Sequence, residues 1–477
     1  MTRINHNIAS LNAINKLVAN NDELSLRLER LSSGLRINSG ADDPAGLIAS
    51  ENLRSEINST NQAIENSIRA NSVIATAEGA LNEVSALLLD IQDLVVNSAN
   101  TGGLSNAEIE ANQLQVDSAV ESITRIANST TFQGKKLLDG SQNFVTQGFV
   151  STDLVDLNVK VVRFGTASSV PVNVERLVSA QTASLDFVAD GLESSNSVTL
   201  EVAGNKGVEV FSFVGSTAAS AISFAINNAS DVTGVSAILS TGGAADAILF
   251  RSQRYGTNAF VSIEALNGTF GLAGGVTRDS GVDATVVING VQAVADGLDV
   301  SINSPALTLD VTLATAYGDG TDASATTSFD ITGGGANFQL GPRVDAQQQQ
   351  VIGLRSIAAH RLGNSTDGLL SDIKTGGSAS LISGNAASAS LVLSSAVNQV
   401  TQLRGELGAF QKNVLDTNIS SLQVTVENLT SSESAIRDAD FAAETAALTR
   451  AQILVQASTA VLMQANAAPQ NVLALLR

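Results

Sequence analysis

Apolar side chains near the start of the chain recur every three or four positions, the spacing of one face of a helix. They fall at Ile4, Ile8, Leu11, Ile14, Val18, Leu24, Leu28, Leu31 and Leu35. This stripe predicts one helix over the first 35 residues. The run SGADDPAG then interrupts the pattern, with Asp43 placed to cap a second helix and Pro44 at its first position.

Helical spacing continues from Ala45 to about Asn100, where NTGGLSN breaks it, and a third helix is predicted from about Ala107 to Ala127. Near the other end, the pattern predicts a very long helix from Asn385 to Ile436, and the segment after it is helical too. The two ends of the chain are alike in kind, so we expect them to meet.

Between these helical parts the chain is rich in Ser, Thr, Gly, Ala and Val. Short alternating runs such as SVTLEVAG, VEVFSFVG, AILFRSQ, AFVSIEAL, ATVVINGVQAV and LTLDVTLA predict strands, and Ser216–Ser230 is the one good helix among them. From about 179 to 341 the basic residues are Lys206, Arg251, Arg254 and Arg278. These features predict a separate, acidic, mostly β insertion.

The predicted fold class is a multidomain α+β protein, with long helical coiled-coil and rod domains formed by both termini around a central, mostly β insertion. Its expected parts are an N-terminal coiled-coil helix (1–43), the N-terminal part of a helical rod domain with a short β segment (44–178), a variable surface-exposed β domain (179–341), the C-terminal part of the rod (342–434) and a C-terminal coiled-coil helix (435–477).

The last segment, AQILVQASTAVLMQANAAPQNVLALLR, has the spacing of a coiled-coil seam. Steps of four and three join Ala447, Ala451, Leu454, Ser458, Val461, Ala465, Ala468, Val472 and Leu475. The opposite face is uncharged, which is typical of a helix buried all round. A private core helix is one interpretation. However, a pair formed with the first helix leaves a second face uncovered, so we predict an assembly surface completed by other copies. Pro469 is expected to end or kink the helix near Ala468.

Composition limits the function further. The formal charge of −20 argues against nucleic acid and anionic membranes. No run approaches the roughly 18 apolar residues of a membrane span, so no membrane insertion is expected. The chain has no cysteine, and its first residues lack the apolar core of a cleaved secretory signal. We therefore expect a cytoplasmic protein or one exported by a route that reads no cleavable signal.

No catalytic, cofactor-binding or metal site is predicted. The histidines, His6 and His360, are too few and too far apart for the His-Glu-x-x-His pattern of a zinc peptidase. The run GDGTDASATTSFDITGGG lacks the lysine of a phosphate loop, and its first half lacks the spaced ligands and closing Glu of a calcium loop. The chain is not expected to be an enzyme.

Four blocks of sequence closely resemble bacterial flagellin. They are LSSGLRINSGADDPAGLIASENL (Leu31–Leu53), AEGALNEV (Ala77–Val84), TTFQGKKLLDGS (Thr130–Ser141) and RAQILVQASTAVLMQANAAPQNVLALLR (Arg450–Arg477). The resemblance covers roughly residues 1–178 and 342–477, in the family's order. The central section shows no comparable match.

The resemblance implies a structural subunit that self-assembles as a helical homopolymer into the extracellular flagellar filament used for swimming. Flagellins are exported unfolded by the flagellar secretion apparatus, with an export chaperone, and are added beneath a cap; hook–filament junction proteins adjoin the filament. Their terminal helices stack around the central channel. On this chain the expected assembly core is Ile4, Ile8, Leu11, Val18, Leu28, Leu31, Leu35, Leu454, Val461, Ala465, Ala468, Val472 and Leu475.

Two open helix faces cannot be buried within one free subunit, and an unpacked helix is marginal in water. We therefore expect residues 1 to about 40 and 440–477 to be largely disordered in the free monomer and to order as subunits add. A hook–filament junction protein remains an alternative. So does a binding module, an adhesin or enzyme displayed by the insertion.

In many flagellins a helix carries the pattern Arg-x-Arg-Glu-Leu-Ala-Val-Gln, read by the Toll-like receptor that senses flagellin. Here the receptor-facing region is expected at Leu89, Asp90, Gln92, Asp93 and Leu94, with Asp90 and Gln92 at the two Arg positions. An anion in place of a cation leaves partner charges unpaired. The resemblance therefore predicts weak recognition by this innate immune receptor; neutral drift on a packing helix is the alternative.

Overall fold

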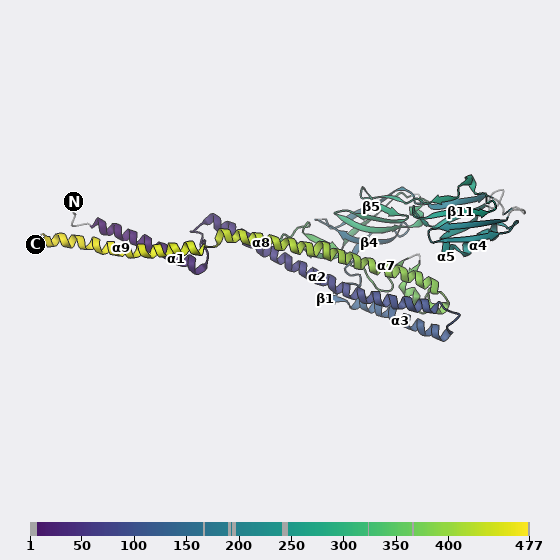
Figure 1. Cartoon of the computed structure of the whole chain (residues 1–477), viewed down its shortest axis with the longest axis horizontal. Helices are drawn as coiled ribbons and strands as arrows, with labels where there is room; N and C mark the ends of the chain where they lie inside the picture. Colours follow the sequence, from purple (N-terminus) through teal and green to yellow (C-terminus); the bar gives the residue numbers. More distant parts are fainter. Residues whose placement is uncertain are drawn as a thin grey trace. The chain divides into compact units, whose positions relative to one another are not determined.

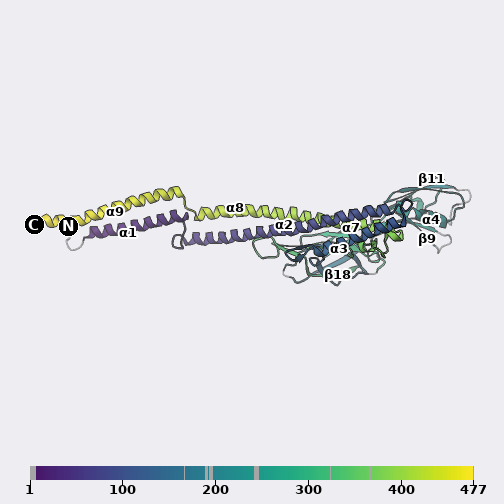
Figure 2. The same cartoon turned by 90° about the horizontal axis from the view of Figure 1, so that it is seen from below.

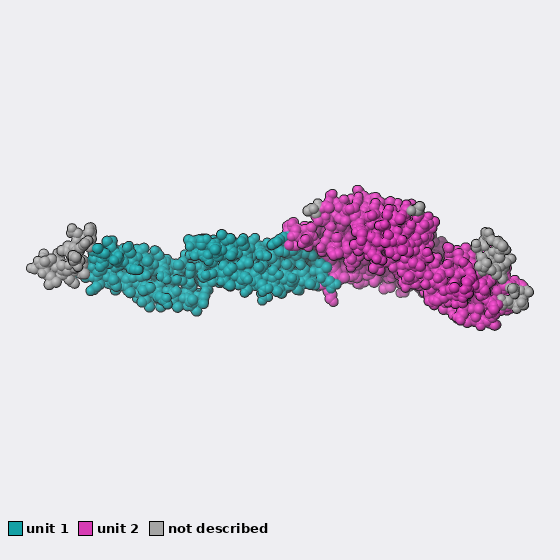
Figure 3. All heavy atoms as spheres, turned by 90° about the horizontal axis from the view of Figure 1, so that it is seen from above, with its two compact units in different colours: residues 1–69, 340–343, 413–477 teal, residues 70–339, 344–412 magenta. Residues whose placement is uncertain are grey.

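The computed structural model describes residues 7–475, apart from 166, 189–191, 193–196, 241–246, 323 and 365–366, and no side chain is described at 240, 247 or 468–475. The chain divides into two compact units (Figure 3). Unit 1 consists of residues 1–69, 340–343 and 413–477, and unit 2 of residues 70–339 and 344–412.

Unit 1 is built from helices α1 (Ile8–Ser33), the first part of α2 (Pro44–Ser98), α8 (Thr417–Arg437) and α9 (Phe441–Leu475). As expected, the two ends of the chain meet, because α1 lies beside α9 (Figures 1 and 2). The start of α2 is confirmed: Pro44 is its first residue, and Asp43 Oδ1 accepts a hydrogen bond from the Gly46 N–H at 2.9 Å.

The last helix differs from the prediction at Pro469. Instead of ending near Ala468, α9 continues through the proline to Leu475. Proline has no N–H, so it cannot donate to the carbonyl four residues earlier. That carbonyl, on Ala465, accepts a hydrogen bond from Asn7 Nδ2 at 2.9 Å instead. A bond from another helix thus replaces the missing one.

The predicted long helix over 385–436 is present, but a short π-helical segment divides it into two α-helices. It consists of α7 (Ala386–Phe410), a π-helical segment η4 (Gln411–Asp416) and α8. Alongside the first part of α2, α8 is held by Asn418 Nδ2, which donates to Ser67 Oγ at 3.2 Å, and by an ion pair of 3.0 Å between Arg437 and Glu51.

The helical part of unit 2 consists of the second part of α2, α3 (Asn106–Ser129) and α7. Ser105 caps α3 in a capping box with Glu108. Short elements connect these helices: β1 (Thr131–Phe132), β2 (Lys135–Lys136), β21 (Gly363–Asn364), β22 (Gly368–Leu369), η2 (Leu370–Ile373) and η3 (Leu381–Ser383).

Among the described residues α2 is long and apolar enough, by length and composition, to cross a membrane, which the sequence pattern did not lead us to expect. The core helix of a soluble protein passes the same test. In unit 2 the apolar residues of α2 lie on one almost completely buried face: Ile74, Ala77, Leu81, Val84, Leu88, Ile91 and Val95. Because Glu83, Asp90 and Asp93 are exposed on the other faces, α2 has the pattern of a core helix.

The β part of unit 2 contains two hydrophobic cores. The first core is formed by side chains of two sheets and of helix α6 (Thr315–Gly318). The strand orders of these sheets are β14-β13-β5-β18-β3 and β15-β16-β17-β4-β20-β19. Its strands are β3 (Phe144–Gln147), β4 (Leu154–Val162), β5 (Val170–Val178), β13 (Thr285–Ile288), β14 (Val291–Gln292), β15 (Val294–Asp296), β16 (Asp299–Asn303), β17 (Leu307–Leu313), β18 (Thr326–Gly334), β19 (Ala336–Gln339) and β20 (Gln349–Ile352).

The second core lies with sheets β6-β10-β9 and β12-β11-β7-β8 and helix α4 (Ala219–Asn228), which is the predicted helix. Its other elements are β6 (Thr182–Val188), β7 (Val198–Gly204), β8 (Val208–Phe213), α5 (Ser230–Thr233), β9 (Val235–Ser240), β10 (Ala247–Tyr255), β11 (Phe260–Asn267), η1 (Ala273–Gly275) and β12 (Arg278–Ser280). Helices from both ends and a β-rich middle confirm the predicted α+β fold class.

The expected division between 178 and 179 does not separate the two cores. Strand β5, just before it, pairs with β13 and β18, both more than a hundred residues later. Strand β4 likewise pairs with β17. The second core is the true insertion: the backbones of Gln181 and Val282 exchange two hydrogen bonds of 2.9 Å where the chain enters and leaves it.

Candidate assembly surface

The α1–α9 contact in unit 1 combines small and polar side chains with several leucine and valine side chains. On α1, the residues turned towards α9 recur at steps of three and four: Ser10, Ala13, Leu17, Asn20, Leu24, Arg27 and Leu31. On α9 the corresponding residues are Glu444, Ala447, Ala451, Val455, Ser458, Leu462 and Ala465. Only Ala13, Glu444 and Ala451 of these two sets are fully buried, at 6%, 8% and 2% exposure. The larger apolar side chains of the two sets are only half-buried, so the contact does not form a closed core.

Most of the predicted apolar stripe of α1 faces away from α9, although Leu24 and Leu31 are turned towards it. Ile8, Leu11, Ile14, Val18 and Leu28 are 55%, 57%, 42%, 53% and 49% exposed. These five exposed residues therefore lie outside the contact between α1 and α9. The reason is that small and polar residues on the other side allow close approach and hydrogen bonds between the helices. Near the end of the stripe, Leu31 and Leu35 are half-buried, and Ile4 lies outside the described residues.

The predicted seam of α9 divides between two faces. Ala447, Ala451, Ser458 and Ala465 are turned towards α1, whereas Leu454 and Val461 are 41% and 59% exposed. Ile453 and Met463 are exposed as well, at 59% and 68%. Ala468, Val472 and Leu475 lie on the helix, but their side chains are outside the description. The side chains of the exposed apolar residues on α1 and α9 are hereafter called the open apolar faces.

Polar bonds fix how the two helices pair. Asn20 Nδ2 donates to Ser458 Oγ at 2.6 Å, and Ser10 Oγ donates to Asn466 Oδ1 at 2.8 Å. Asn7 Nδ2 adds the bond to the Ala465 carbonyl. Polar groups in a helix seam specify register at some cost in stability. The pair is thus defined in register while contributing little hydrophobic energy.

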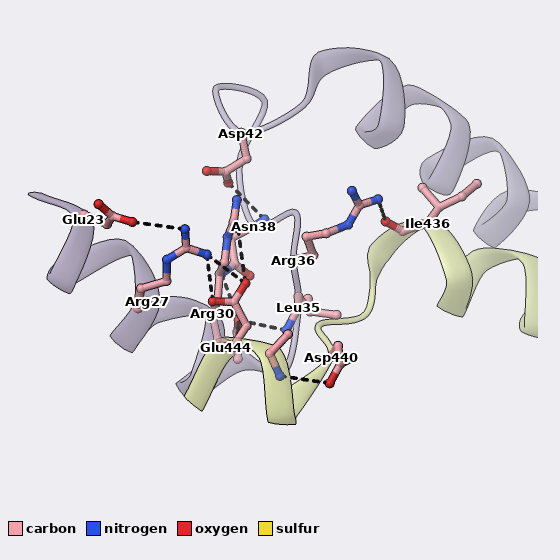
Figure 4. Close-up of polar contacts among 12 residues, drawn as sticks. Glu23, Arg27, Arg30, Leu35, Arg36, Asn38, Asp42, Ile436, Asp440 and Glu444 are labelled. Carbon is pink, nitrogen blue, oxygen red and sulfur yellow. Dashed lines mark hydrogen bonds and ion pairs between the residues drawn. The ribbon is translucent and has the colours of Figure 1, made fainter. Parts of the chain in front are cut away.

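A cluster of charges lies where α1 and α9 begin to diverge (Figure 4). The Glu444 carboxylate is 2.9 Å from Arg27 and 3.3 Å from Arg30, and Arg27 also contacts Glu23 at 3.3 Å. Burial tends to raise the pKa of the Glu444 carboxyl, but the hydrogen bonds and charges of the two arginines outweigh it and hold this pKa below its usual value. Glu444 is therefore ionised when the helices are paired at neutral pH.

The connections next to this cluster are held by the backbone. The Arg36 N–H donates to the Arg437 carbonyl at 2.7 Å, and the Ala439 N–H donates to the Gly34 carbonyl at 2.9 Å. Gly34 ends α1 in the left-handed region, at φ 73°. Asp42 accepts backbone hydrogen bonds from Asn38 and Ser39, which lower the pKa of its carboxyl.

Sequence reasoning missed this charged cluster, although one signal was present. Glu444 is the only acidic residue in α9. In a helix that is otherwise nearly uncharged, a lone acid points to a specific cationic partner. Its partners could not be identified, because Arg27 and Arg30 lie more than four hundred residues away along the chain.

The predicted receptor-facing region is a solvent-facing part of α2 in unit 2. Leu89 is 52% exposed, and Asp90, Gln92 and Asp93 are exposed, while Leu94 is half-buried. Their orientation follows from the core-facing residues between them, since Leu88 and Ile91 are completely buried.

The described residues include no group of three or more His, Cys, Asp or Glu side chains arranged to hold a metal ion. A polar cavity of about 510 Å³ in unit 2 is lined by Asp156, Lys160, Asp310 and Arg355, among others. Lys160 already pairs there with Asp310 at 2.6 Å and with Glu406 at 2.9 Å. The open apolar faces, rather than this cavity, are the distinctive surface of the chain.

The helices that carry the open apolar faces lie within segments that match known protein families. Residues 4–143 match the bacterial flagellin N-terminal helical region, and residues 392–476 match the bacterial flagellin C-terminal helical region. The chain is 30% identical to the B-type flagellin of Pseudomonas aeruginosa and 31% identical to the flagellin of Salmonella typhimurium, with 99% of both chains covered in each case. It is 30% identical to the flagellin of Bacillus subtilis, with 100% of both chains covered.

Proposed function

Because this chain belongs to the bacterial flagellin family, and is thus a structural subunit of the flagellar filament and not an enzyme, we propose that it self-assembles through its open apolar faces. The observation that carries the proposal is the outward orientation of the α1 stripe. Ile8, Leu11 and Val18 are each more than half exposed on a helix whose other side is already paired.

The energetics favour polymerisation over a private core. Fully burying one Leu, Ile or Val side chain contributes about 1.5–3 kcal/mol. Several such side chains on α1 and α9 of every subunit would together outweigh the entropy lost when a subunit adds. A contact between different faces of neighbouring subunits does not close on itself, so it generates an open helical filament.

Ordering of the terminal helices accompanies this assembly. Among the described apolar side chains of the α1–α9 pair, Ala13 and Ala451 are the fully buried ones, and an isolated helix pair is marginal in water. Residues 1 to about 40 and 440–477 thus order fully only as subunits add. The expected division into a terminal coiled-coil part (1–43 and 435–477), a helical rod (44–178 and 342–434) and an outer β region (179–341) belongs to the same proposal.

Export follows from the same features. The subunit passes unfolded through the flagellar secretion apparatus, helped by an export chaperone, and joins the extracellular filament beneath the cap, beyond the hook–filament junction proteins. The absence of cysteine supports this route, because no disulfide has to be broken before export. The filament then serves swimming motility.

Seeded polymerisation tests the proposal. Purified chain is added to short filament fragments, and growth is followed by electron microscopy for the full-length protein and for a version ending at Thr449. Full-length protein is expected to extend the seeds, and the truncated protein to remain folded but monomeric. Failure of the full-length protein to extend any seed would contradict the proposal.

Deleting a different part of the chain shows whether the loss of residues alone prevents polymerisation. Removing residues 182–281 deletes the second β core at a point where its two connections meet. Filaments are expected to form without it. If these filaments lose adhesion that full-length filaments show, the second core displays a binding function in addition.

We further propose that innate immune receptor recognition of this chain is weak. Exposed Asp90 and Gln92 stand where many flagellins carry arginine, so the receptor groups that would pair with those cations meet an anion or an uncharged amide instead. Changing both residues, Asp90→Arg and Gln92→Arg, is expected to raise potency in a cell-based receptor assay, with Glu83→Arg as a charge control. Full potency of the unchanged protein would reject this proposal.

A further inference from the structure

One backbone carbonyl inside α9 has lost its helical donor. Pro469 lies within the helix and has no N–H, so the carbonyl of Ala465 cannot make the usual bond four residues along. Ala465 is half-buried on the side of α9 turned towards α1. An unmade hydrogen bond at such a site destabilises the helix pair.

The side chain of Asn7 supplies the missing donor. Asn7 Nδ2 donates to the Ala465 carbonyl at 2.9 Å, while Asn7 Oδ1 accepts a hydrogen bond from the Ser10 N–H at 3.1 Å. The same amide thus caps the start of α1 and repairs the interrupted turn of α9. Only a side chain with both a donor and an acceptor can do this. Aspartate keeps the acceptor for the cap but has no donor when ionised.

We infer that Asn7 and Pro469 together set the register of α1 against α9. Pro469 is the only proline of α9, so the interior of that helix offers one carbonyl freed in this way. Sliding α1 by a heptad would leave the Ala465 carbonyl unpaired and place Asn7 beside carbonyls that are already bonded. The bond of 2.8 Å between Ser10 and Asn466 lies next to this position and favours the same register.

This register matters for assembly, and the inference rests on the proposed function. The open apolar faces are contributed by two helices, so neighbouring subunits meet a continuous surface only if α1 and α9 are correctly aligned. Asn7 and Pro469 are therefore positioning residues for polymerisation. Their contribution is separate from the apolar contacts themselves.

A double-mutant cycle tests the inference. The critical concentration for seeded polymerisation is measured for the full chain and for Asn7→Asp, Pro469→Ala and the double variant. Asn7→Asp removes the donor and keeps the cap, and is expected to raise the critical concentration about fivefold, the effect of one lost hydrogen bond. Pro469→Ala restores an N–H that can bond the Ala465 carbonyl. In that background the effect of Asn7→Asp is expected to fall below about twofold.

Asn12→Asp is the matched control, because Asn12 is an exposed residue of α1 on a face turned neither towards α9 nor along the stripe. It is expected to change the critical concentration by less than twofold. Equal effects of Asn7→Asp with and without Pro469 would overturn the inference, and so would no effect in either. In both cases the unchanged protein still polymerises, so the proposed function stands. If the unchanged protein does not polymerise, both fall.

Discussion

The two units of this chain use apolar residues in opposite ways. In the β part of unit 2, large side chains such as Phe250, Leu309 and Tyr317 are completely buried. In unit 1, α8 has no buried residue, and the fully buried residues in the described part of the α1–α9 pair are Ala13, Glu444 and Ala451. Several larger apolar residues of that pair, including Leu11 and Val18, face outward. Unit 2 completes its own cores, whereas the described part of the α1–α9 pair in unit 1 buries few side chains completely.

This difference explains how one chain can be stable and still polymerise. A unit with closed cores keeps its fold whether or not neighbours are present. A unit whose apolar side chains point outward is completed only by contacts with other copies, since exposed apolar surface of this kind marks interaction sites. If the account is correct, substitutions in the two units must separate folding from assembly.

The largest expected effect comes from a charge on the open apolar face of α1. Val18→Asp would bury an unpaired carboxylate at every subunit contact, so the critical concentration for seeded polymerisation is expected to rise at least about 100-fold. Val208→Asp in unit 2 is a matched control, because Val18 and Val208 are both 53% exposed. Normal polymerisation by the Val18 variant would refute the comparison between the units.

A cavity in unit 2 is expected to show the reverse behaviour. Leu309 lies in the first β core with no exposed surface, and Leu309→Ala should lower the free energy of unfolding by about 2–5 kcal/mol. Calorimetry of the monomer measures this loss. The same variant should still extend filament seeds below its unfolding temperature. A loss of polymerisation without a loss of stability would contradict the assignment.

Removing the charge of Glu444 is expected to have an intermediate effect on assembly. Glu444→Gln removes the anion that Arg30 contacts and leaves Arg27 with Glu23 alone, which should raise the critical concentration about tenfold. Unit 2 should melt unchanged, since none of these residues belongs to it. An unchanged critical concentration would show that the cluster is not needed for pairing.

The same carboxylate predicts a pH dependence. Its pKa is lowered in the paired helices, so it contributes stability that is fully present above its unfolded value of about 4.3 and is lost as the pH falls through the lower, paired value. Filament dissociation followed by light scattering should therefore begin below about pH 4.3 and change less steeply with pH in Glu444→Gln. Identical pH profiles for the two proteins would count against this role.

Local patterns predicted the elements well but not which side of a helix makes contact. Pro44 and Asp43 marked the start of α2, and alternating residues marked strands such as β7 and β17, because caps and strand periodicity are local properties. The stripe of α1 was recognised as apolar and assigned to the assembly core, but the pattern did not show that α9 pairs mainly with another face of α1.

Features that depend on residues far apart in the sequence could not be predicted from local patterns. The shared core of β5 and β13 joins strands on either side of the hundred-residue insertion, which composition could not show. The donor to the carbonyl that Pro469 leaves free is on Asn7, at the opposite end of the chain. The same holds for the partners of Glu444. In each case the sequence contains the chemical group, and only the fold brings its partner to it.

Amide hydrogen exchange of the free monomer and of the filament tests the central claim most directly. Residues 8–33 and 441–467, which form the described part of the α1–α9 pair, are expected to exchange rapidly in the monomer and to become strongly protected in the filament. Over the same comparison the strands of the two β cores should be protected equally in both states. Equally strong protection of the terminal helices in the free monomer would contradict the account, because unit 1 would then have a complete core of its own.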